Sequence, residues 1–224
     1  MISIIIPTYN EGQNIQMLLS ELGRVGKRLQ EPFEIVVVDD NSPDGTAEMV
    51  RRMDRGNVSL LVRKHQRGLT SAVRDGAKIA KGDKIIVIDA DLSHPPEKVV
   101  GLIKGLKEAD LVIGSRHLPG GGVEEWPWHR KIVSDGATML SKFVIRHTVT
   151  DPMSGFFAIR KKILTRTALK VKGYKILMNI LAKNPNIKIK EIPYVFRNRR
   201  VGKSKLNLKG MVTFILDVSR LLFT

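Results

Sequence analysis

Short runs of apolar, mostly β-branched residues recur along the first half of this chain, separated by amphipathic segments. The runs are residues 2–6, 34–38, 58–62, 84–88 and 110–113. Each run contains at least three consecutive apolar residues rather than an alternating pattern, which is typical of strands covered on both faces. The segments between them repeat apolar residues at helical spacing, at residues 13–29, 44–53, 69–80 and 97–106. This alternation predicts an α/β fold with a mostly parallel, doubly wound sheet flanked by helices.

Charge and composition limit the classes of function. The 224 residues include 38 Lys and Arg against 22 Asp and Glu, a formal net charge of +16. Such an excess predicts an anionic partner, whether a nucleotide, a membrane phospholipid or a nucleic acid. The absence of cysteine excludes a disulfide framework, a thiol nucleophile and a cysteine zinc site. We expect a single domain over residues 1–224, with neither a signal peptide nor a transmembrane segment.

Polar clusters follow three of the predicted strands, at residues 8–11, 39–41 and 89–91. In open α/β sheets ligands bind beyond the carboxyl ends of the strands, so we expect these clusters to form one cleft. Asp39 and Asp40 could together cap the next helix. Asp39 is better placed to accept hydrogen bonds from a base or ribose, whereas Asp40 is expected only to cap. Ser42 is its predicted N-cap, with Pro43 at the first helical position. Tyr9 is equally suited to stacking on a nucleobase and to packing on a neighbouring loop.

The Asp89-Ala90-Asp91 tripeptide carries the most chemical information. Two carboxylates two residues apart at a strand end, with Ser93 following, offer hard oxygen ligands to Mg²⁺ or Mn²⁺ and leave coordination sites for a diphosphate. Such close like charges repel unless a cation or hydrogen-bond donors compensate them. The alternative is that the aspartates only cap turns. Their place after a buried strand favours the metal site.

The second half of the chain supplies cations suited to phosphate: Arg116, Arg130, Lys175 and the segment 199–205. For any single one of these cations, a solvated surface charge is favoured over a phosphate contact. In the last segment Gly202 and Ser204 accompany the cations, and there the two interpretations are balanced. Neither a Walker motif nor G-x-G-x-x-G follows a strand, which disfavours kinases and dehydrogenases. The scattered histidines are expected to be packing or surface residues.

Several segments together resemble a known family. They are Ile-Ile-Pro-Thr-Tyr-Asn-Glu at 5–11, Val-Val-Asp-Asp-Asn-Ser-Pro-Asp-Gly-Thr at 37–46, Arg-Gly-Leu-Thr-Ser-Ala at 67–72, Asp-Ala-Asp-Leu-Ser-His-Pro-Pro at 89–96, Gly-Ser-Arg at 114–116, Asp-Pro-Met-Ser-Gly-Phe-Phe at 151–157, Tyr-Lys-Ile-Leu-Met at 174–178 and Arg-x-x-Gly-x-Ser-Lys-Leu at 199–206. The chain thus resembles the inverting family 2 glycosyltransferases of the GT-A fold, and among them the dolichol-phosphate mannose synthases. The last three motifs are the ones more specific to polyprenyl-phosphate acceptors.

The resemblance implies a donor site in the first half, residues 1–116, and an acceptor and membrane-interface half, residues 117–224. A metal ion would be held by Asp91 with Asp89 and Ser93, either directly or, at Ser93, through water. The nucleoside, diphosphate and sugar would contact Pro7, Tyr9, Glu11, Val37, Asp39, Asp89, Ala90, Asp91, Arg116, Lys175, Arg199 and Lys205. The acceptor phosphate would meet Arg130 and Ser134. Asp151 is assigned to loop structure or sugar contact, not to general-base catalysis.

The implied reaction moves mannose from GDP-mannose to dolichyl phosphate with inversion. A phosphate monoester whose second pKa is near ~6 is already largely dianionic at neutral pH, so no general base is needed. A glucosyltransferase using UDP-glucose is the alternative enzyme. A noncatalytic protein that binds membranes or nucleic acid is the alternative of another class. An RNA reader would present exposed aromatics among its cations, and aromatics make up only 5% of this chain.

Two basic amphipathic segments, residues 130–147 and 208–223, are compatible with packing on the core and equally with lying in a membrane interface. The implied lipid acceptor favours the interface, because its polyprenyl tail stays in the bilayer. We therefore expect a peripheral membrane protein at the cytoplasmic face, with no nucleic-acid partner. The resemblance leaves room for a small membrane-anchoring subunit.

Overall fold

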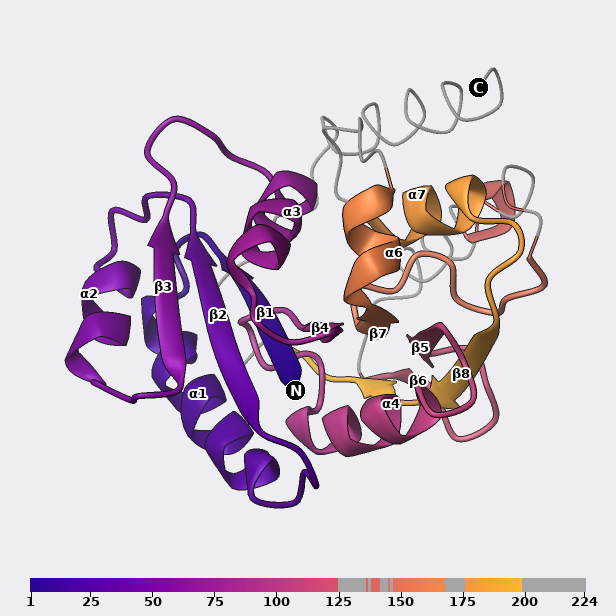
Figure 1. Ribbon diagram of the computed structural model, residues 1–224, viewed down its shortest axis with the longest axis horizontal. Coiled ribbons are helices and arrows are strands. Elements are labelled where there is room, and N and C mark those ends of the chain that lie inside the picture. The colour runs from indigo at the N-terminus through magenta and orange to yellow at the C-terminus, as the bar shows by residue number, and fades with distance from the viewer. Residues whose placement is uncertain (125–135, 137, 142–144, 146, 168–175, 199–224) are drawn as a thin grey trace.

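The computed structural model describes residues 1–124, 136, 138–141, 145, 147–167 and 176–198. Its main feature is a seven-stranded sheet with the order β3-β2-β1-β4-β7-β5-β8 (Figure 1). The strands are β1 (Ile2–Thr8), β2 (Phe33–Asp39), β3 (Val58–Val62), β4 (Lys84–Val87), β5 (Leu111–Ser115), β7 (Phe157–Arg160) and β8 (Ile189–Pro193). Two short strands, β6 (Gly122–Val123) and β9 (Val195–Phe196), form a separate parallel pair.

The directions of the strands decide which loops meet. β1 pairs in parallel with β2 and β4, β2 pairs in parallel with β3, and β5 pairs in parallel with β8. β7 runs antiparallel between β4 and β5. The carboxyl ends of β1, β2, β4 and β5 therefore lie at one edge of the sheet, together with the amino end of β7. The mostly parallel α/β fold is confirmed, and the five predicted strands are present.

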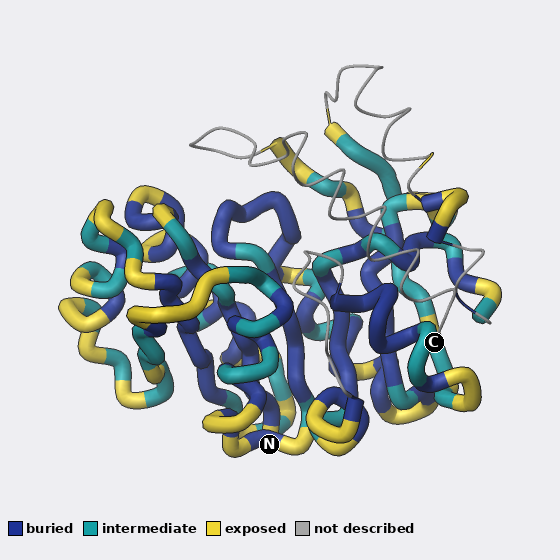
Figure 2. The backbone as a smooth tube through the Cα atoms, turned by 90° about the horizontal axis from the view of Figure 1, so that it is seen from above, coloured by how far each residue is buried: buried dark blue, intermediate teal, exposed yellow. Residues whose placement is uncertain are grey.

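Helices cover both faces of this sheet. On one face α1 (Gly12–Gly26), α2 (Thr46–Arg52) and α4 (Val99–Gly105), which follows the 3₁₀ turn η1 (Pro96–Lys98), pack on the strands. On the other lie α3 (Leu69–Ile79), α6 (Lys161–Arg166) and α7 (Ile176–Lys183). Within β1, Ile4 and Ile6 join the first core while Ile5 joins the second, as the two-residue period of a strand requires. The buried strands run through the middle of Figure 2.

The start of α2 differs from the sequence prediction. The helix begins at Thr46, not at Pro43, and its N-cap is Gly45 in the left-handed region at φ 83°. The Asp44 carboxylate accepts hydrogen bonds from the amides of Thr46 (3.0 Å) and Gly12 (2.9 Å), so it joins the starts of α1 and α2. Ser42 does not cap the helix, because its hydroxyl is engaged by Asp39. The hydrogen bonds that Asp44 and Asp39 accept therefore determine where α2 begins, and the local Ser42-Pro43 pattern does not.

The two segments expected to face a membrane are only partly described. Residues 208–223 and most of residues 130–147 lie outside the described residues. Within the described ranges, no helix combines the length and apolarity that crossing a bilayer requires. Met139 and Leu140 are exposed, at 64% and 50% of their surfaces, while Thr138 and Ser141 beside them are buried.

Candidate active site

The candidate active site lies at the edge where the carboxyl ends of β1, β2, β4 and β5 meet. The three polar clusters predicted to converge follow β1, β2 and β4 there, and Arg116 follows β5. This is the edge at which open α/β sheets bind ligands. Five other residues predicted for the site lie outside the described residues: Arg130, Ser134, Lys175, Arg199 and Lys205.

Asp39 connects the loops that follow β1 and β2. Its side chain is fully buried and accepts hydrogen bonds from the Thr8 hydroxyl (2.9 Å), the Ser42 amide (2.8 Å) and the Ser42 hydroxyl (2.6 Å). The Ser42 hydroxyl in turn accepts the amide of Asn10 at 2.9 Å. Asp39 thereby holds the two loops together at the floor of the expected nucleoside site. Among the other residues predicted for this site, Val37 is buried and Pro7 is half-buried.

Glu11 lies at the start of α1, where its position is set by neighbours. The side chain is 8% exposed, and its Oε2 accepts a hydrogen bond from Asn14 Nδ2 at 3.0 Å. Its backbone amide donates to the Thr46 hydroxyl at 3.0 Å. The loop after β1 is therefore held from both sides, by Asp39 through Ser42 and by Thr46.

Asp40 has a role that the sequence prediction missed. It does not cap a helix. Its carboxylate accepts the Nε of buried Arg63 at 2.8 Å and the amide of Gly68 at 2.8 Å. Arg63 also reaches Asp75 on α3 at 3.1 Å. A buried arginine is stabilised in this way only because two carboxylates and several acceptors surround it.

The loop after β3 that this ion-pair network anchors covers Tyr9. The Arg67 guanidinium lies 4.6 Å from the centre of the Tyr9 ring, at the distance of a cation–π contact. Tyr9 thus packs on a neighbouring loop, which is one of its two predicted uses. Stacking on a nucleobase stays a prediction.

The loop from Asp89 to Ser93 presents the predicted metal ligands. The Asp89 side chain is 33% exposed, whereas Asp91 is 2% exposed and its Oδ1 accepts the Ser93 amide (3.1 Å) and hydroxyl (2.5 Å). Leu92, between Asp91 and Ser93, has a backbone φ of 63°. A bulky residue at positive φ is an outlier that costs about 1–3 kcal/mol and persists only where surrounding contacts impose it. The hydrogen bonds from Ser93 to Asp91 therefore help to hold the loop in this strained arrangement.

His94 is a buried residue that is hydrogen-bonded to the start of this loop. Its ring is buried, stacks on Phe156 with centroids 5.0 Å apart, and meets Tyr194 and Phe196 edge-on. The Nδ1 atom accepts the backbone amide of Asp89 at 3.1 Å. As expected for a packing histidine it is a core residue, but this hydrogen bond also fixes the start of the aspartate loop.

Electrostatic effects on His94 show which charges surround it. Burial lowers the pKa of His94, and the charges of Asp89, Asp91, Arg116 and Asp151 also act on it. The three carboxylates raise this pKa, and the guanidinium lowers it. These four groups come from three separate loops. Arg116, the predicted cation of the site that the structure describes, therefore lies close to the paired aspartates.

Arg116 is oriented by Asp151. The fully buried carboxylate accepts Arg116 Nε at 2.7 Å, Nη2 at 2.8 Å and the backbone amide at 3.1 Å. Burial alone would raise the pKa of Asp151, but the hydrogen bonds and charge of Arg116 outweigh it and hold the pKa below its ordinary value. Asp151 thus serves loop structure, one of its two assigned roles.

The Asp151 loop is itself fixed by Glu191 on β8. Glu191 accepts the amides of Thr150 and Asp151 at 2.8 and 3.2 Å, and the Thr150 hydroxyl at 2.9 Å. Sequence reasoning did not find Glu191. Its only signal was an acidic residue beside Lys190 between two apolar residues of a short segment.

The donor set at Asp89 and Asp91 fits a divalent metal ion shared with a substrate. Their oxygens are hard ligands of the kind that Mg²⁺ and Mn²⁺ prefer, and both cations keep ligand positions for phosphates and water. The described residues contain no group of three His, Cys, Asp or Glu side chains suited to a metal. A metal at this loop would therefore complete its coordination with the serine, water and a diphosphate.

Comparison with known proteins identifies the family. The model for "Glycosyl transferase family 2" matches residues 3–167, which contain every loop described above. The chain belongs to glycosyl transferase family 2. A dolichol-phosphate mannosyltransferase from Pyrococcus furiosus is 42% identical over 99% of this chain, which spans 63% of that relative's length. One from Saccharomyces cerevisiae is 36% identical, over 98% of this chain and 86% of the yeast protein.

Solved structures of more distant glycosyltransferases share the fold. Mannosyl-3-phosphoglycerate synthase from Rubrobacter xylanophilus matches with a TM-score of 0.70 at 17% identity, over 99% of this chain and 72% of its own. Glucosyl-3-phosphoglycerate synthase from Mycobacterium tuberculosis, in a complex with Mn²⁺, UDP and phosphoglyceric acid, matches with a TM-score of 0.71 at 18% identity, over 100% and 77%. Together with the sheet order, these likenesses confirm the expected GT-A architecture.

Proposed function

We propose that this family 2 glycosyltransferase transfers mannose from GDP-mannose to dolichyl phosphate with inversion, giving dolichyl β-D-mannosyl phosphate. The observation that carries the proposal is the paired carboxylates of Asp89 and Asp91 beside an oriented Arg116. Such a site offers a place for a metal and a cation next to one diphosphate. The dolichol-phosphate mannosyltransferase names of the archaeal and yeast relatives support the choice of sugar and acceptor.

In this proposal the nucleoside lies over the loops after β1 and β2. Pro7, Tyr9, Glu11, Val37 and Asp39 are its expected neighbours. The Asp39 carboxylate already organises these loops, so a base or ribose would bind beside a preformed floor. Ala90 and Asp91 would lie under the diphosphate, and Lys175, Arg199 and Lys205 would complete the contacts to its phosphates and sugar.

Asp91, with Asp89 and Ser93, would hold Mg²⁺ or Mn²⁺ at the diphosphate. When bound, the ion would neutralise charge on the departing diphosphate. The Mn²⁺ in the related mycobacterial structure supports a divalent metal here. Arg116, oriented by Asp151, would direct guanidinium N–H donors at the leaving group.

The acceptor supplies its own nucleophile. A phosphate oxygen of dolichyl phosphate attacks the anomeric carbon from the face opposite the diphosphate, and the bond to GDP breaks with its electron pair leaving on GDP. The acceptor is already ionised near neutral pH, so no proton has to be removed. Arg130 and Ser134 are proposed to bind the acceptor phosphate and so reduce its repulsion from the donor.

We also propose that the enzyme works as a peripheral protein at the cytoplasmic face of a membrane. The exposed Met139 and Leu140 lie in the predicted basic amphipathic segment, as apolar residues of an interfacial helix would. Residues 1–116 would then hold the donor, and residues 117–224 would meet the lipid. A small membrane-anchoring subunit is compatible with this arrangement.

A transfer assay tests the proposal directly. The full chain is incubated with dolichyl phosphate in detergent, Mg²⁺ or Mn²⁺, and labelled GDP-mannose or UDP-glucose, and label is followed into the lipid fraction. We expect lipid labelling from GDP-mannose only, and its loss with a chelator. Labelling from UDP-glucose alone would replace the donor assignment, and no lipid labelling with either donor would refute the proposal.

A further inference from the structure

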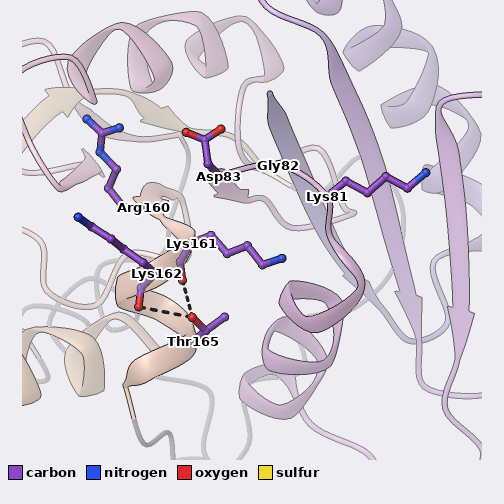
Figure 3. Close-up of a pocket in the computed structure, with 7 residues that line it drawn as sticks. All are labelled: Lys81, Gly82, Asp83, Arg160, Lys161, Lys162 and Thr165. Atoms are coloured by element: carbon purple, nitrogen blue, oxygen red, sulfur yellow. Dashed lines mark hydrogen bonds between the residues drawn. The ribbon is translucent and has the colours of Figure 1, made fainter.

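A second cluster of cations lies at the edge of the sheet opposite the candidate active site. A pocket of about 530 Å³ is formed where β4 begins and β7 ends, and its lining consists of Lys81, Gly82, Asp83, Arg160, Lys161, Lys162 and Thr165 (Figure 3). Asp89 lies five positions after Lys84, the first residue of β4, and at roughly 3.3 Å per residue this is about 16 Å. The pocket is therefore distinct from the site at Asp89 and Asp91.

Two of the pocket's cations are held in place by backbone carbonyls and have no carboxylate partner among the described residues. Arg160 Nη2 donates to the backbone carbonyl of Leu106 at 2.7 Å, and Lys161 Nζ donates to that of Ala80 at 2.5 Å. A carbonyl acceptor orients a cation but leaves its full charge in place, unlike a carboxylate. Each side chain also keeps further N–H donors for a ligand.

The remaining charges of the pocket also favour an anion. Within the described residues, the Nζ atoms of Lys81 and Lys162 have neither a hydrogen bond nor an ion pair, and both side chains are exposed. The one lining carboxylate, Asp83, is paired with the amino group of Met1 at 3.1 Å. The pocket therefore combines four positive charges with one negative charge that is already engaged.

The arrangement suits an extended anion better than a single phosphate. Figure 3 shows Arg160 and Lys162 projecting to one side, Lys161 and Lys81 to the other, and Asp83 between the two pairs. A second depression of about 670 Å³ continues from Lys162. Its lining adds two cations, Arg166 and Lys183, and one carboxylate, Asp110, which accepts the Lys188 amide at 3.2 Å. Positive charge is thus distributed along a path longer than one phosphate group.

We infer that this pocket is a binding site for a soluble polyphosphate group, such as the linked phosphates of a small-molecule ligand. Arg160 and Lys161 would form its fixed part, and Lys81 and Lys162 would close on the two ends of the anion. Charge-assisted hydrogen bonds of this kind are the strong ones in phosphate recognition. The inference is independent of the proposed transfer reaction, because none of these residues belongs to the candidate active site.

The test uses inorganic tripolyphosphate as the probe and isothermal titration calorimetry on the full chain with a chelator present. The double variant Lys81→Gln/Lys162→Gln removes one cation from each side of the pocket. We expect its affinity to fall about tenfold or more, corresponding to about 1.4 kcal/mol. The matched control Lys27→Gln/Lys104→Gln removes the same charge from exposed positions outside the pocket and is expected to bind like the wild type. Asp83→Asn removes the carboxylate and is expected to bind more tightly.

Three results would overturn the inference: no binding of tripolyphosphate to the wild type, equal binding by the pocket variant, or an equal loss in the control variant. A sedimentation assay with phosphatidylglycerol vesicles distinguishes a lipid source. Vesicle binding that depends on Lys81 and Lys162 but is not competed by tripolyphosphate would also contradict a soluble ligand. Both double variants are assayed for mannosyl transfer in parallel, where unchanged rates are expected, so failure of the proposed function would appear separately.

Discussion

Asp91 is 2% exposed, and its carboxylate already accepts two hydrogen bonds from Ser93, so its geometry is set before a ligand binds. Asp91→Asn keeps the size of the side chain and one acceptor oxygen but removes the charge that a metal requires. We expect mannosyl transfer to fall about 10²-fold or more while the fold is retained. Transfer kinetics and circular dichroism measure the two effects. Wild-type activity in this variant would remove Asp91 from the metal site.

His94 is expected to act through the position of Asp89. His94→Phe keeps an aromatic ring in the stack with Phe156 but removes the acceptor of the Asp89 amide, whereas His94→Asn retains an acceptor near Nδ1. We expect His94→Phe to raise the metal concentration needed for half-maximal transfer. His94→Asn should raise this concentration less. If both variants need the same metal concentration as the wild type and differ from it only in stability, His94 has a packing role alone.

The buried pair of Asp151 and Arg116 predicts a pH-dependent contribution to stability. Asp151→Asn leaves Arg116 without its charged partner, and breaking such a pair costs about 3–5 kcal/mol. Because the folded pKa of Asp151 lies below its ordinary value near ~4, its contribution is complete above about pH 4 and is lost as pH falls through the lower, folded pKa. Urea unfolding from pH 7 to pH 2.5 should therefore show the difference between wild type and variant shrinking only below about pH 4. A difference that is constant over this range would contradict the assignment.

Helix α3 packs on the sheet through Gly76, a position where the element tolerates no side chain. A Cβ atom there would lie 2.9 Å from methyl groups of both Ile5 and Val38. Gly76→Ala gains about 1 kcal/mol of helix propensity, but we expect overpacking to cost about 1–3 kcal/mol and to give net destabilisation.

Urea denaturation of Gly76→Ala measures this balance. Gly56→Ala is the control, since a Cβ at Gly56 would have no heavy atom within 4 Å. We expect the control to be neutral. A stabilised Gly76→Ala variant would mean that α3 shifts on the sheet without cost.

The whole molecule carries a net charge of +16. We expect this charge to strengthen binding to anionic membranes, whichever residues contact the lipid. Each Lys or Arg near an anionic lipid surface contributes about 1 kcal/mol, and salt screens this attraction. We expect cosedimentation with phosphatidylserine vesicles at low salt and its loss near ~0.5 M salt, with little binding to neutral vesicles. Salt-independent binding would instead indicate apolar insertion as the main contribution.

Regular elements with strong local patterns were predictable. β1 to β5 and α1 to α4 occur where apolar runs and helical spacing indicated them, because continuous burial and a 3.6-residue period leave their signal in consecutive residues. β7, with only four residues, was missed, as was β8, which has polar residues at an edge of the sheet. Such segments become strands because neighbouring strands offer hydrogen bonds.

The residue types of the candidate site were also legible, but several of their partners were not. Asp40 was expected to cap a helix and instead neutralises Arg63, 23 residues away. Arg116 is oriented by Asp151 and, through Thr150, by Glu191. Side-chain contacts between distant loops leave no periodic signal in the chain.

Local sequence therefore established the α/β layers and the acidic strand ends, since burial and backbone preference act over a few neighbouring residues. Folding in three dimensions decided that β7 runs antiparallel between β4 and β5, that His94 lies among the charges of Asp89, Asp91, Arg116 and Asp151, and that a second cationic pocket forms at the opposite edge. The physical reason is that electrostatic and hydrogen-bond energies depend on distances in space, which only the packing of the whole chain determines.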